Sequence, residues 1–360
     1  MSAALRSRCT IDLGFPFHRA ETPAERLRAL ADWMEGRGAS WDLYCAGSTA
    51  EALEARIAEL TGKDAAVWMP SGTMGQGIAA RLHCARTGSN RLGLHPSSHL
   101  LLHEQDGVRH VHRLEPVEIG AWRREIRASD LTDDLGCAII ELGQRQTGGL
   151  LPDWETLEAL KAEARARGIP LQMDGARLWS VRPHFDNRSY AEVCEGFSSV
   201  YVSFYKDIGA IGGAALAGDK AFVAELRTWR ARMGGMLPMA WPNIADALRR
   251  LDTEIAAMPD RVARARLLGD AIARIDGLDV LPVQTNLFHV LADAPVDAIE
   301  AARNAVAEED GIWLFGRCWD YPDQAAPAIE MSVGETLLAL DPQIVIDAFT
   351  RFAQRLPGKS

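Results

Sequence analysis

Residues 169–179 read IPLQMDGARLW, an apolar run that ends in an aspartate and, three residues later, an arginine. The run is typical of a buried strand, and Asp174 follows it directly. Ligands of α/β sheets bind beyond the carboxyl ends of the strands, where loops and helix N-termini converge. A buried carboxylate there needs a cation. The pattern therefore indicates either a structural pair with Arg177 or a ligand-binding carboxylate.

The segments around this strand alternate between apolar runs and amphipathic helical patterns. Near-continuous apolar strands separated by such helices are typical of a parallel or mixed sheet covered by helices on both faces. The sequence therefore predicts an α/β fold with a mostly parallel sheet. The expected strands are 65–70, 136–142, 169–174, 198–204 and 212–218, and the expected helices are 156–168 and 49–62, the latter capped by Ser48 or Thr49 and closed by Gly62.

The C-terminal third changes character. A long helical pattern runs from Asn243 to about Gly277, and a strand, helix, strand, strand, helix order follows it. This order predicts a smaller α+β domain. We therefore expect an N-terminal segment (1–47), a large domain (48–250), and a linking helix with a small C-terminal domain (251–360).

Composition excludes several classes of protein. The 360 residues are 48% hydrophobic and 24% charged, and the formal charge of −10 comes without a basic block. This balance is typical of a globular protein and disfavours nucleic acid or an anionic membrane as a partner. No signal peptide or membrane span is recognisable, so we expect a cytoplasmic protein. The six scattered cysteines, with no CxxC pair, suit reduced thiols better than disulfides or zinc.

A second motif, WMPSGTMGQG at 68–77, places a Ser-Gly-Thr turn between an expected strand and a helix beginning near Met74. A helix N-terminus points free backbone N–H groups at an anion, and Gly72 lets an anion approach closely. The motif therefore suits a phosphate. Taken alone, Ser-Gly-Thr before a helix is more often a simple cap.

A third motif, VSFYKDIGAIGG at 202–213, places Lys206 after an apolar strand and before a glycine-rich turn. Partial desolvation there lowers the pKa of a lysine and makes its amine a usable nucleophile. The alternative is a lysine that extends from a strand end to solvent.

Together the three motifs fit one cofactor, because pyridoxal phosphate needs an anion cradle, a lysine and a carboxylate for its ring nitrogen. Their order also resembles the threonine aldolases and related β-eliminating lyases of the aspartate-aminotransferase fold, which have a large and a small domain. The similarity runs over most of the chain from about residue 42 to 218. The motifs that carry it are 41–76, SSHLLLHEQDG at 97–107, ELGQRQTGGLLP at 141–152, QMDGARLW at 172–179 and 199–218.

The resemblance implies a role for individual residues. Lys206 would be the Schiff-base lysine, and Asp174 would be the partner of the pyridine nitrogen. Arg177 would lie beside the phenolic oxygen of the cofactor and would also contact the substrate. His99 would stack on the ring and take part in proton transfer. The phosphate would be held by Gly72, Thr73 and Met74.

Three histidines, His95, His99 and His103, are spaced by four residues, which on a helix would place potential metal ligands on one face. Pro96 argues against a continuous helix there. We therefore expect no metal site.

The chain also departs from the family pattern. Gln144 stands where the family usually has a histidine that contacts the substrate hydroxyl, so it is a substrate-binding candidate, but a glutamine cannot act as a base. Glu330 stands where an arginine clamps the substrate carboxylate, and Leu237 replaces a further arginine. The arginine that would bind the substrate carboxylate would then be replaced by Arg317, on an expected strand, or by Arg145. Three residues, LRS at 5–7, resemble the family's opening and make Ser7 a substrate-binding candidate.

The resemblance implies a lyase that cleaves the Cα–Cβ bond of a β-hydroxy-α-amino acid, with a substrate preference moved away from threonine. The alternative within the same chemistry is β-elimination from a β-substituted amino acid. A transaminase fits less well because the arginine clamp is missing, and a non-catalytic descendant would not need Lys206. A nicotinamide enzyme would need a GxGxxG after its first strand. Members of this fold usually share active sites between subunits, so we expect a homodimer or homotetramer.

Overall fold

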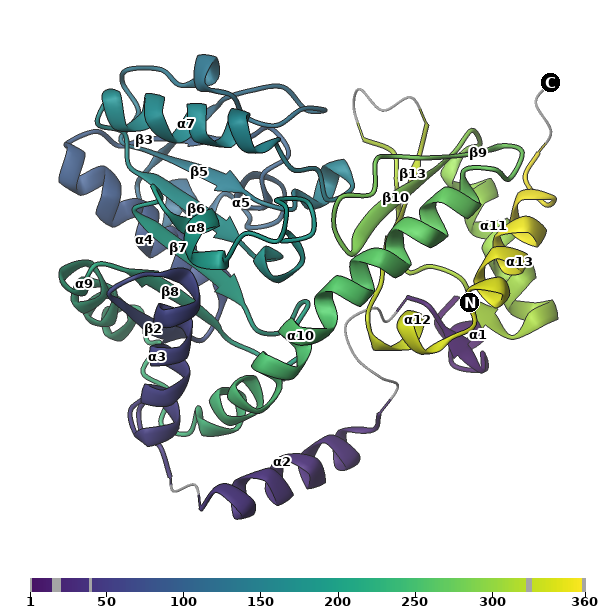
Figure 1. The fold of residues 1–360 in the computed structure, drawn as a ribbon, viewed down its shortest axis with the longest axis horizontal. Coiled ribbons are helices and arrows are strands. Elements are labelled where there is room, and N and C mark those ends of the chain that lie inside the picture. Colours follow the sequence, from purple (N-terminus) through teal and green to yellow (C-terminus); the bar gives the residue numbers. More distant parts are fainter. Residues whose placement is uncertain (1, 15–20, 39–40, 322–325, 358–360) are drawn as a thin grey trace. The chain divides into compact units, whose positions relative to one another are not determined.

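The structure is a computed structural model that describes residues 2–14, 21–38, 41–321 and 326–357 (Figure 1). Two compact units make up the chain. The large unit comprises 23–146 and 151–256, and the small unit comprises 1–22, 147–150 and 257–360. The expected boundary after residue 250 lies shortly before the division at 256–257. The expected N-terminal segment 1–47 is instead shared, because its beginning belongs to the small unit and its part from Pro23 onward to the large unit.

A seven-stranded sheet forms the centre of the large unit, and Figure 1 shows its strands beside one another with helices around them. Strand β8 runs antiparallel to both of its neighbours, and the other strand pairs are parallel. The predicted α/β fold with a mostly parallel sheet is therefore confirmed. In spatial order the strands are β2 (Ala65–Met69), β8 (Ala214–Gly218), β7 (Ser199–Ser203), β6 (Leu171–Gly175), β5 (Cys137–Glu141), β3 (Arg91–Leu94) and β4 (Glu115–Glu118).

Helix α4 (Gly72–Thr87) packs along the sheet and buries Ile78 and Leu82 against Val67 of β2 and Leu216 of β8. All four of these side chains are at most 4% exposed. This apolar contact fixes the helix whose N-terminus follows β2. The other helices of this unit are α2 (Pro23–Arg37), α3 (Ser48–Thr61), α5 (His99–Leu102), α6 (Gly107–His110), η1 (Ala128–Asp130), α7 (Trp154–Ala166), η3 (Leu178–Ser180), α8 (Tyr190–Cys194) and α9 (Lys220–Arg232), while η2 (Arg145–Thr147) begins in it.

Helix α3 is capped in a different way from the one expected. Its N-cap is Gly47, and no side-chain cap comes from Ser48 or Thr49. The carboxylate of Asp42 accepts hydrogen bonds from the backbone N–H of Ala50, at 2.7 Å, and of Thr49, at 3.4 Å. A Cβ at Gly47 would collide with Asp42 Oδ1, so only glycine allows this approach.

The small unit has an antiparallel sheet of four strands in the order β12 (Cys318–Trp319), β13 (Ala328–Ser332), β10 (Leu287–Ala292) and β9 (Leu278–Val280). Strand β1 (Ile11–Asp12) pairs with β11 (Ile312–Trp313), and Leu13 is buried in the same core. This pairing explains why the chain's beginning groups with its end. The helices are α1 (Ser2–Arg6), α11 (Val296–Asp310), α12 (Glu335–Ala339) and α13 (Pro342–Ala353), and α10 (Trp241–Ile272) runs across the division.

Among the described helices, none combines the length and the apolar character needed to cross a lipid bilayer. All six cysteines are free thiols, and four of them are buried: Cys45, Cys84, Cys137 and Cys194.

Candidate active site

The residues singled out in the large unit gather at one edge of its sheet. Parallel strands bring their carboxyl ends to the same edge, where loops collect ligand-binding side chains. A small cavity lies there, and it is formed entirely within the large unit. Its lining residues are Ser97, His99, Glu141, Arg145, Gln146, Asp174, Arg177 and Lys206.

Asp174 is 2% exposed at the end of β6. Its Oδ2 accepts a hydrogen bond from Gln76 Nε2 at 2.9 Å, and its Oδ1 accepts one from the backbone N–H of Ala176 at 3.0 Å. Both donors are neutral amides, and no ion pair joins Asp174 to Arg177 in the described structure. The Arg177 guanidinium is buried as well, and its Nε has no partner among the described residues. The structural Asp–Arg pair that the sequence left open is therefore not formed.

Lys206 lies three residues after the end of β7 and faces the same cavity. Burial lowers the pKa of its ammonium group, and the nearby Arg177 cation lowers it further, while Asp174 opposes this. A lowered pKa increases the fraction of neutral amine, which is the nucleophilic form. The lysine therefore has the environment that the sequence predicted.

His99 begins α5 and remains a neutral imidazole at neutral pH. Burial, followed by the Lys206 cation, lowers the pKa of His99 to about 4. Five residues on, burial raises the pKa of Glu104 to about 7, although a hydrogen bond from the Thr73 hydroxyl opposes the change. Glu104 Oε1 lies 3.9 Å from His99 Nε2. At this distance the two groups are not hydrogen-bonded to each other, but the Glu104 carboxyl group titrates near neutrality close to the His99 ring.

Glu141 ends β5 and lies in register with Asp174 on the neighbouring parallel strand. Its Oε1 accepts a hydrogen bond from the backbone N–H of Arg145 at 3.0 Å. Burial and, next, the Asp174 carboxylate raise the pKa of Glu141 to about 7. Two carboxyl groups side by side disfavour a double negative charge.

The N-terminus of α4 follows β2 and begins at Gly72, two residues before the expected start. The hydroxyl of Ser71 caps it by accepting from the backbone N–H of Met74 at 3.2 Å. The N–H groups at the start of a helix have no intrahelical acceptor and attract anions. A Cβ at Gly72 would collide with the Tyr201 hydroxyl, so no larger residue fits there.

Gln144 is hydrogen-bonded into a neighbouring loop. Its Nε2 donates to His95 Nδ1 at 2.5 Å and to Ser97 Oγ at 2.7 Å. His95 Nε2 lies 2.9 Å from the carbonyl oxygens of Ala121 and Arg124, which makes Nε2 the donor and Nδ1 the acceptor. The two residues after Gln144, Arg145 and Gln146, both line the cavity.

Comparison with known proteins agrees with this geometry. A model of the β-eliminating lyase family matches residues 27–295. The chain belongs to this family. It is 29% identical over 359 residues to the "Probable low-specificity L-threonine aldolase 2" of Arabidopsis thaliana, covering 95% of this chain and 97% of the relative. It is 25% identical over 283 residues to the low specificity L-threonine aldolase of Escherichia coli K12, covering 76% and 83%.

Solved structures agree with the family and the fold of this chain. A "putative L-allo-threonine aldolase" of Listeria monocytogenes is 32% identical with a TM-score of 0.89, and the match covers 98% of both chains. Serine palmitoyltransferase of Sphingomonas wittichii, at 16% identity and a TM-score of 0.70, covers 97% of this chain and 89% of that one, and shares the fold. The family resemblance and the two-part fold that the sequence predicted are confirmed.

Three of the residues singled out from the sequence lie in the small unit. Ser7 is exposed, and its Oγ donates to the carbonyl oxygen of Ala4 at 3.1 Å. Arg317 is exposed and lies just before β12, rather than on the expected strand. Glu330 lies on β13 directly opposite His289 of β10. In the large unit, Leu237 is 38% exposed. The substrate-binding roles of Ser7 and Arg317 stay predictions.

Sequence reasoning missed four polar residues of this site: Gln76, Glu104, Glu141 and Gln146. Glu141 has a recognisable signal, because it ends an apolar strand as Asp174 does. Gln76 lies one helical turn beyond the Ser71–Gly72 turn, where α4 is buried. Glu104 lies in a loop and Gln146 in the single turn of η2, and neither segment is long enough for a periodic pattern to distinguish a buried side chain from an exposed one.

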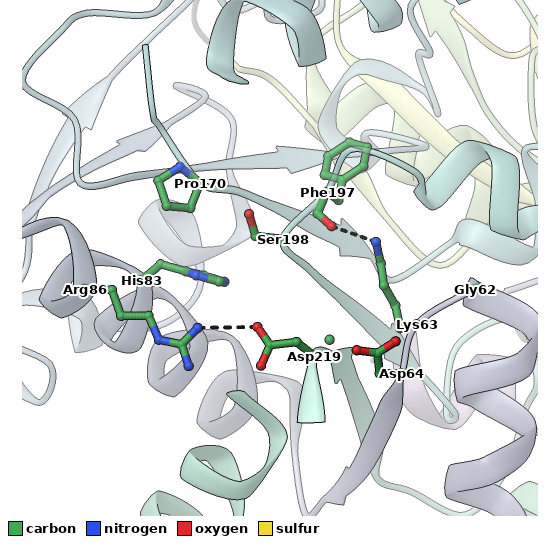
Figure 2. Close-up of a pocket in the computed structure, with 10 residues that line it drawn as sticks. Gly62, Lys63, Asp64, His83, Arg86, Pro170, Phe197, Ser198 and Asp219 are labelled. Atoms are coloured by element: carbon green, nitrogen blue, oxygen red, sulfur yellow. Dashed lines mark hydrogen bonds and ion pairs between the residues drawn. The ribbon is translucent and has the colours of Figure 1, made fainter. Parts of the chain in front are cut away.

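A larger cavity, of about 390 Å³, lies at the opposite edge of the same sheet. Figure 2 shows the residues that line it. Its lining includes Asp64 and Ser198, which precede β2 and β7, and Gly218, which ends the antiparallel strand β8. Its cations bind protein groups: Lys63 Nζ donates to the carbonyl oxygen of Phe197 at 2.7 Å, and Arg86 lies 3.6 Å from Asp219. The smaller cavity is therefore the candidate active site, because the buried lysine and two carboxyl groups line it, and the first turns of α4 reach it through the hydrogen bond from Gln76 to Asp174.

Proposed function

We propose that the protein is a pyridoxal-phosphate-dependent lyase that cleaves the Cα–Cβ bond of a β-hydroxy-α-amino acid, giving glycine and an aldehyde. The observation that carries this proposal is the cavity at which Lys206, Asp174 and Arg177 meet beside the N-terminus of α4. The threonine aldolases among its relatives support the same reaction.

The residues present fit pyridoxal phosphate. Lys206 Nζ would hold the cofactor, the N-terminus of α4 would bind its phosphate through Gly72, Thr73 and Met74, and Asp174 would keep a proton on its ring nitrogen. The buried Nε of Arg177, which has no partner among the described residues, would donate to the phenolic oxygen. When bound, the cofactor supplies a conjugated ring that accepts the electrons of the breaking bond.

The proton exchange that the reaction requires falls to the pair of His99 and Glu104 beside the cavity. His99 is neutral at neutral pH, so its ring can stack without adding a positive charge. Glu104, with its pKa raised to about 7, can both hold and release a proton at Oε1 near neutral pH. The pair is therefore suited to act as an acid–base relay on one side of the site.

The α-carboxylate of the substrate would be bound by Arg145, together with Arg177. Both arginines line the cavity, and Arg145 is close enough to His99 and Lys206 to lower the pKa of each. Arginine suits a carboxylate because its planar guanidinium donates two parallel hydrogen bonds. The sequence analysis named Arg317 and Arg145 as possible replacements for the family arginine that Glu330 displaces. We propose that Arg145 is the replacement.

The test is to supply the purified holoenzyme with a panel of β-hydroxy amino acids and to identify the products by mass spectrometry. Glycine and an aldehyde are expected. Pyruvate or another keto acid with ammonia would instead identify β-elimination, and an exchange of amino groups between substrates would identify a transaminase.

We expect the protein to be a poor aldolase for threonine relative to its best substrate. The motif places Glu330 where the family has an arginine, and loss of a charged clamp costs about 2 to 5 kcal/mol of recognition, which Arg145 and Arg177 would offset only in part. Gln144 also stands where the family has a histidine, and a glutamine cannot act as a base. The measurement is turnover of threonine before and after Glu330→Arg, with Arg317→Ala in parallel. Threonine cleavage as efficient as that of every other panel member would contradict this substrate preference.

We also expect a homodimer or a homotetramer at micromolar concentration. Two segments of the large unit expose apolar side chains together: Trp41 and Tyr44 are 69% and 55% exposed, and Met239 is 57% exposed. The backbone N–H of Tyr44 donates to the carbonyl oxygen of Pro238 at 3.1 Å, which joins the segments. Adjoining exposed apolar residues mark protein interfaces. A monomer in analytical ultracentrifugation would contradict this assembly.

A further inference from the structure

Gln146 is a buried polar residue of the site that none of the motifs identified. It belongs to η2 and directly follows Arg145. Its side chain lines the cavity with His99, Asp174 and Lys206, and the residue is 3% exposed. A buried carboxamide at a cavity wall must find hydrogen-bond partners on the protein or on a ligand.

The protein satisfies one end of this carboxamide. Gln146 Nε2 lies 2.6 Å from His103 Nε2, and the ring of His103 lies beside that of His99, with the ring centroids 5.1 Å apart. The other end, Oε1, is buried and has no hydrogen-bond partner among the described residues. Buried amide atoms nearly always have a partner, so a ligand in the cavity is expected to supply this one.

Gln144 offers a contrast two residues earlier. Its Nε2 is committed to His95 and Ser97, which hold the loop before α5. The family pattern places Gln144 where a histidine contacts the substrate hydroxyl, but it is Gln146 that lines the cavity.

The chemistry of the substrate decides which of its groups meets Gln146. Its carboxylate suits the cations of Arg145 and Arg177, and its amino group suits the position of Lys206. The remaining polar group of a β-hydroxy-α-amino acid is its uncharged hydroxyl, and a neutral carboxamide matches it without a charge to desolvate. If the amide is turned over, its N–H₂ meets the hydroxyl instead, and a hydroxyl can both donate and accept.

We propose that Gln146 binds the β-hydroxyl of the substrate and thereby selects β-hydroxy amino acids over their deoxy analogues. This inference rests on the proposed function. A carboxamide cannot take the proton of the hydroxyl, so Gln146 holds the hydroxyl in place, and the acid–base work falls to the pair of His99 and Glu104. One buried hydrogen bond of this kind is expected to give about tenfold discrimination in binding.

The experiment uses holoenzyme and two ligand pairs that differ only in the hydroxyl: L-threonine with L-2-aminobutyrate, and L-3-phenylserine with L-phenylalanine. Binding is read in a stopped-flow instrument from the change in the visible absorbance of the bound cofactor, before product accumulates. The wild type is expected to bind the hydroxylated member of each pair about tenfold more tightly. In Gln146→Leu, the two affinities are expected to become equal through loss of affinity for the hydroxylated member alone.

The variant His103→Leu is the matched control, because it removes the neighbour of Gln146 and leaves the carboxamide at the cavity. It should retain the wild-type ratio. An unchanged ratio in Gln146→Leu, or an equal loss for both members of a pair, would overturn the role of Gln146 in hydroxyl binding. So would His103→Leu abolishing the ratio, because Gln146 would then act only through His103. If no amino acid alters the cofactor absorbance of the wild type, the proposed function itself fails.

Discussion

Replacing Lys206 by alanine is expected to remove the visible absorbance of the covalently held cofactor and to lower turnover by at least about 10³-fold. Lys206 Nζ is the buried amine of the cavity, and both burial and the Arg177 cation lower its pKa. No other lysine lines the described cavity, so a substitute amine is lacking. The measurement is an absorbance spectrum with added pyridoxal phosphate, followed by turnover of the best substrate.

Lys220→Ala is the matched control for this change. Lys220 is an exposed lysine at the start of α9, and its loss should leave both the spectrum and turnover unchanged. A wild-type protein that stays colourless with added cofactor would contradict the assignment of the cofactor. A coloured Lys206→Ala protein with wild-type turnover would contradict the assignment of the lysine.

The variant Asp174→Asn is expected to bind the cofactor yet to lose about 10²- to 10³-fold in turnover, the usual cost of removing one preorganised charge at a reacting centre. The amide keeps the shape of the side chain but cannot stabilise a proton on the ring nitrogen. In the wild type, Gln76 Nε2 and the backbone N–H of Ala176 donate hydrogen bonds to the Asp174 carboxylate. In the variant, the amide group that replaces this carboxylate faces the same two donors. Turnover and the cofactor dissociation constant are measured on the same preparation.

Asp153→Asn is the control here, because Asp153 is an exposed N-cap residue of α7 and asparagine caps a helix equally well. It should change neither quantity. If Asp174→Asn retains full turnover, the carboxylate does not act on the ring nitrogen. If the variant fails to bind cofactor although its thermal unfolding is unchanged, Asp174 is needed for binding rather than for catalysis.

The sequence alone predicted the architecture and the strand ends at which Asp174 and Lys206 lie. Strand and helix patterns are local, because each element shows its apolar face within one short stretch of chain, and this locality is why the strand ends were identified. Asp174 and Lys206 were found because each interrupts an apolar pattern just where a parallel strand ends. The small-domain pattern was readable for the same reason, since β10, α11 and β13 each carry their own periodicity.

The tertiary structure decided which polar side chains meet. Glu141 lies beside Asp174 only because β5 and β6 pair in that register, and a shift of one residue would turn one carboxyl group to the other face. Burial then raises the pKa of Glu141 and of Glu104 to about 7, a change that no sequence pattern reports. The same holds for the beginning of the chain, whose place depends on the pairing of β1 with β11, a strand near the opposite end of the sequence.

The sequence and the structure differ most clearly over which of two glutamines faces the cavity. By sequence, Gln144 occupies the motif position and Gln146 is one polar residue in a loop. In the structure, the turn into the short η2 helix directs Gln144 to His95 and Ser97 and leaves Gln146 at the cavity wall. The direction of a side chain in a loop depends on the backbone turn and on partners that are distant in the sequence, and these contacts form only when the chain has folded.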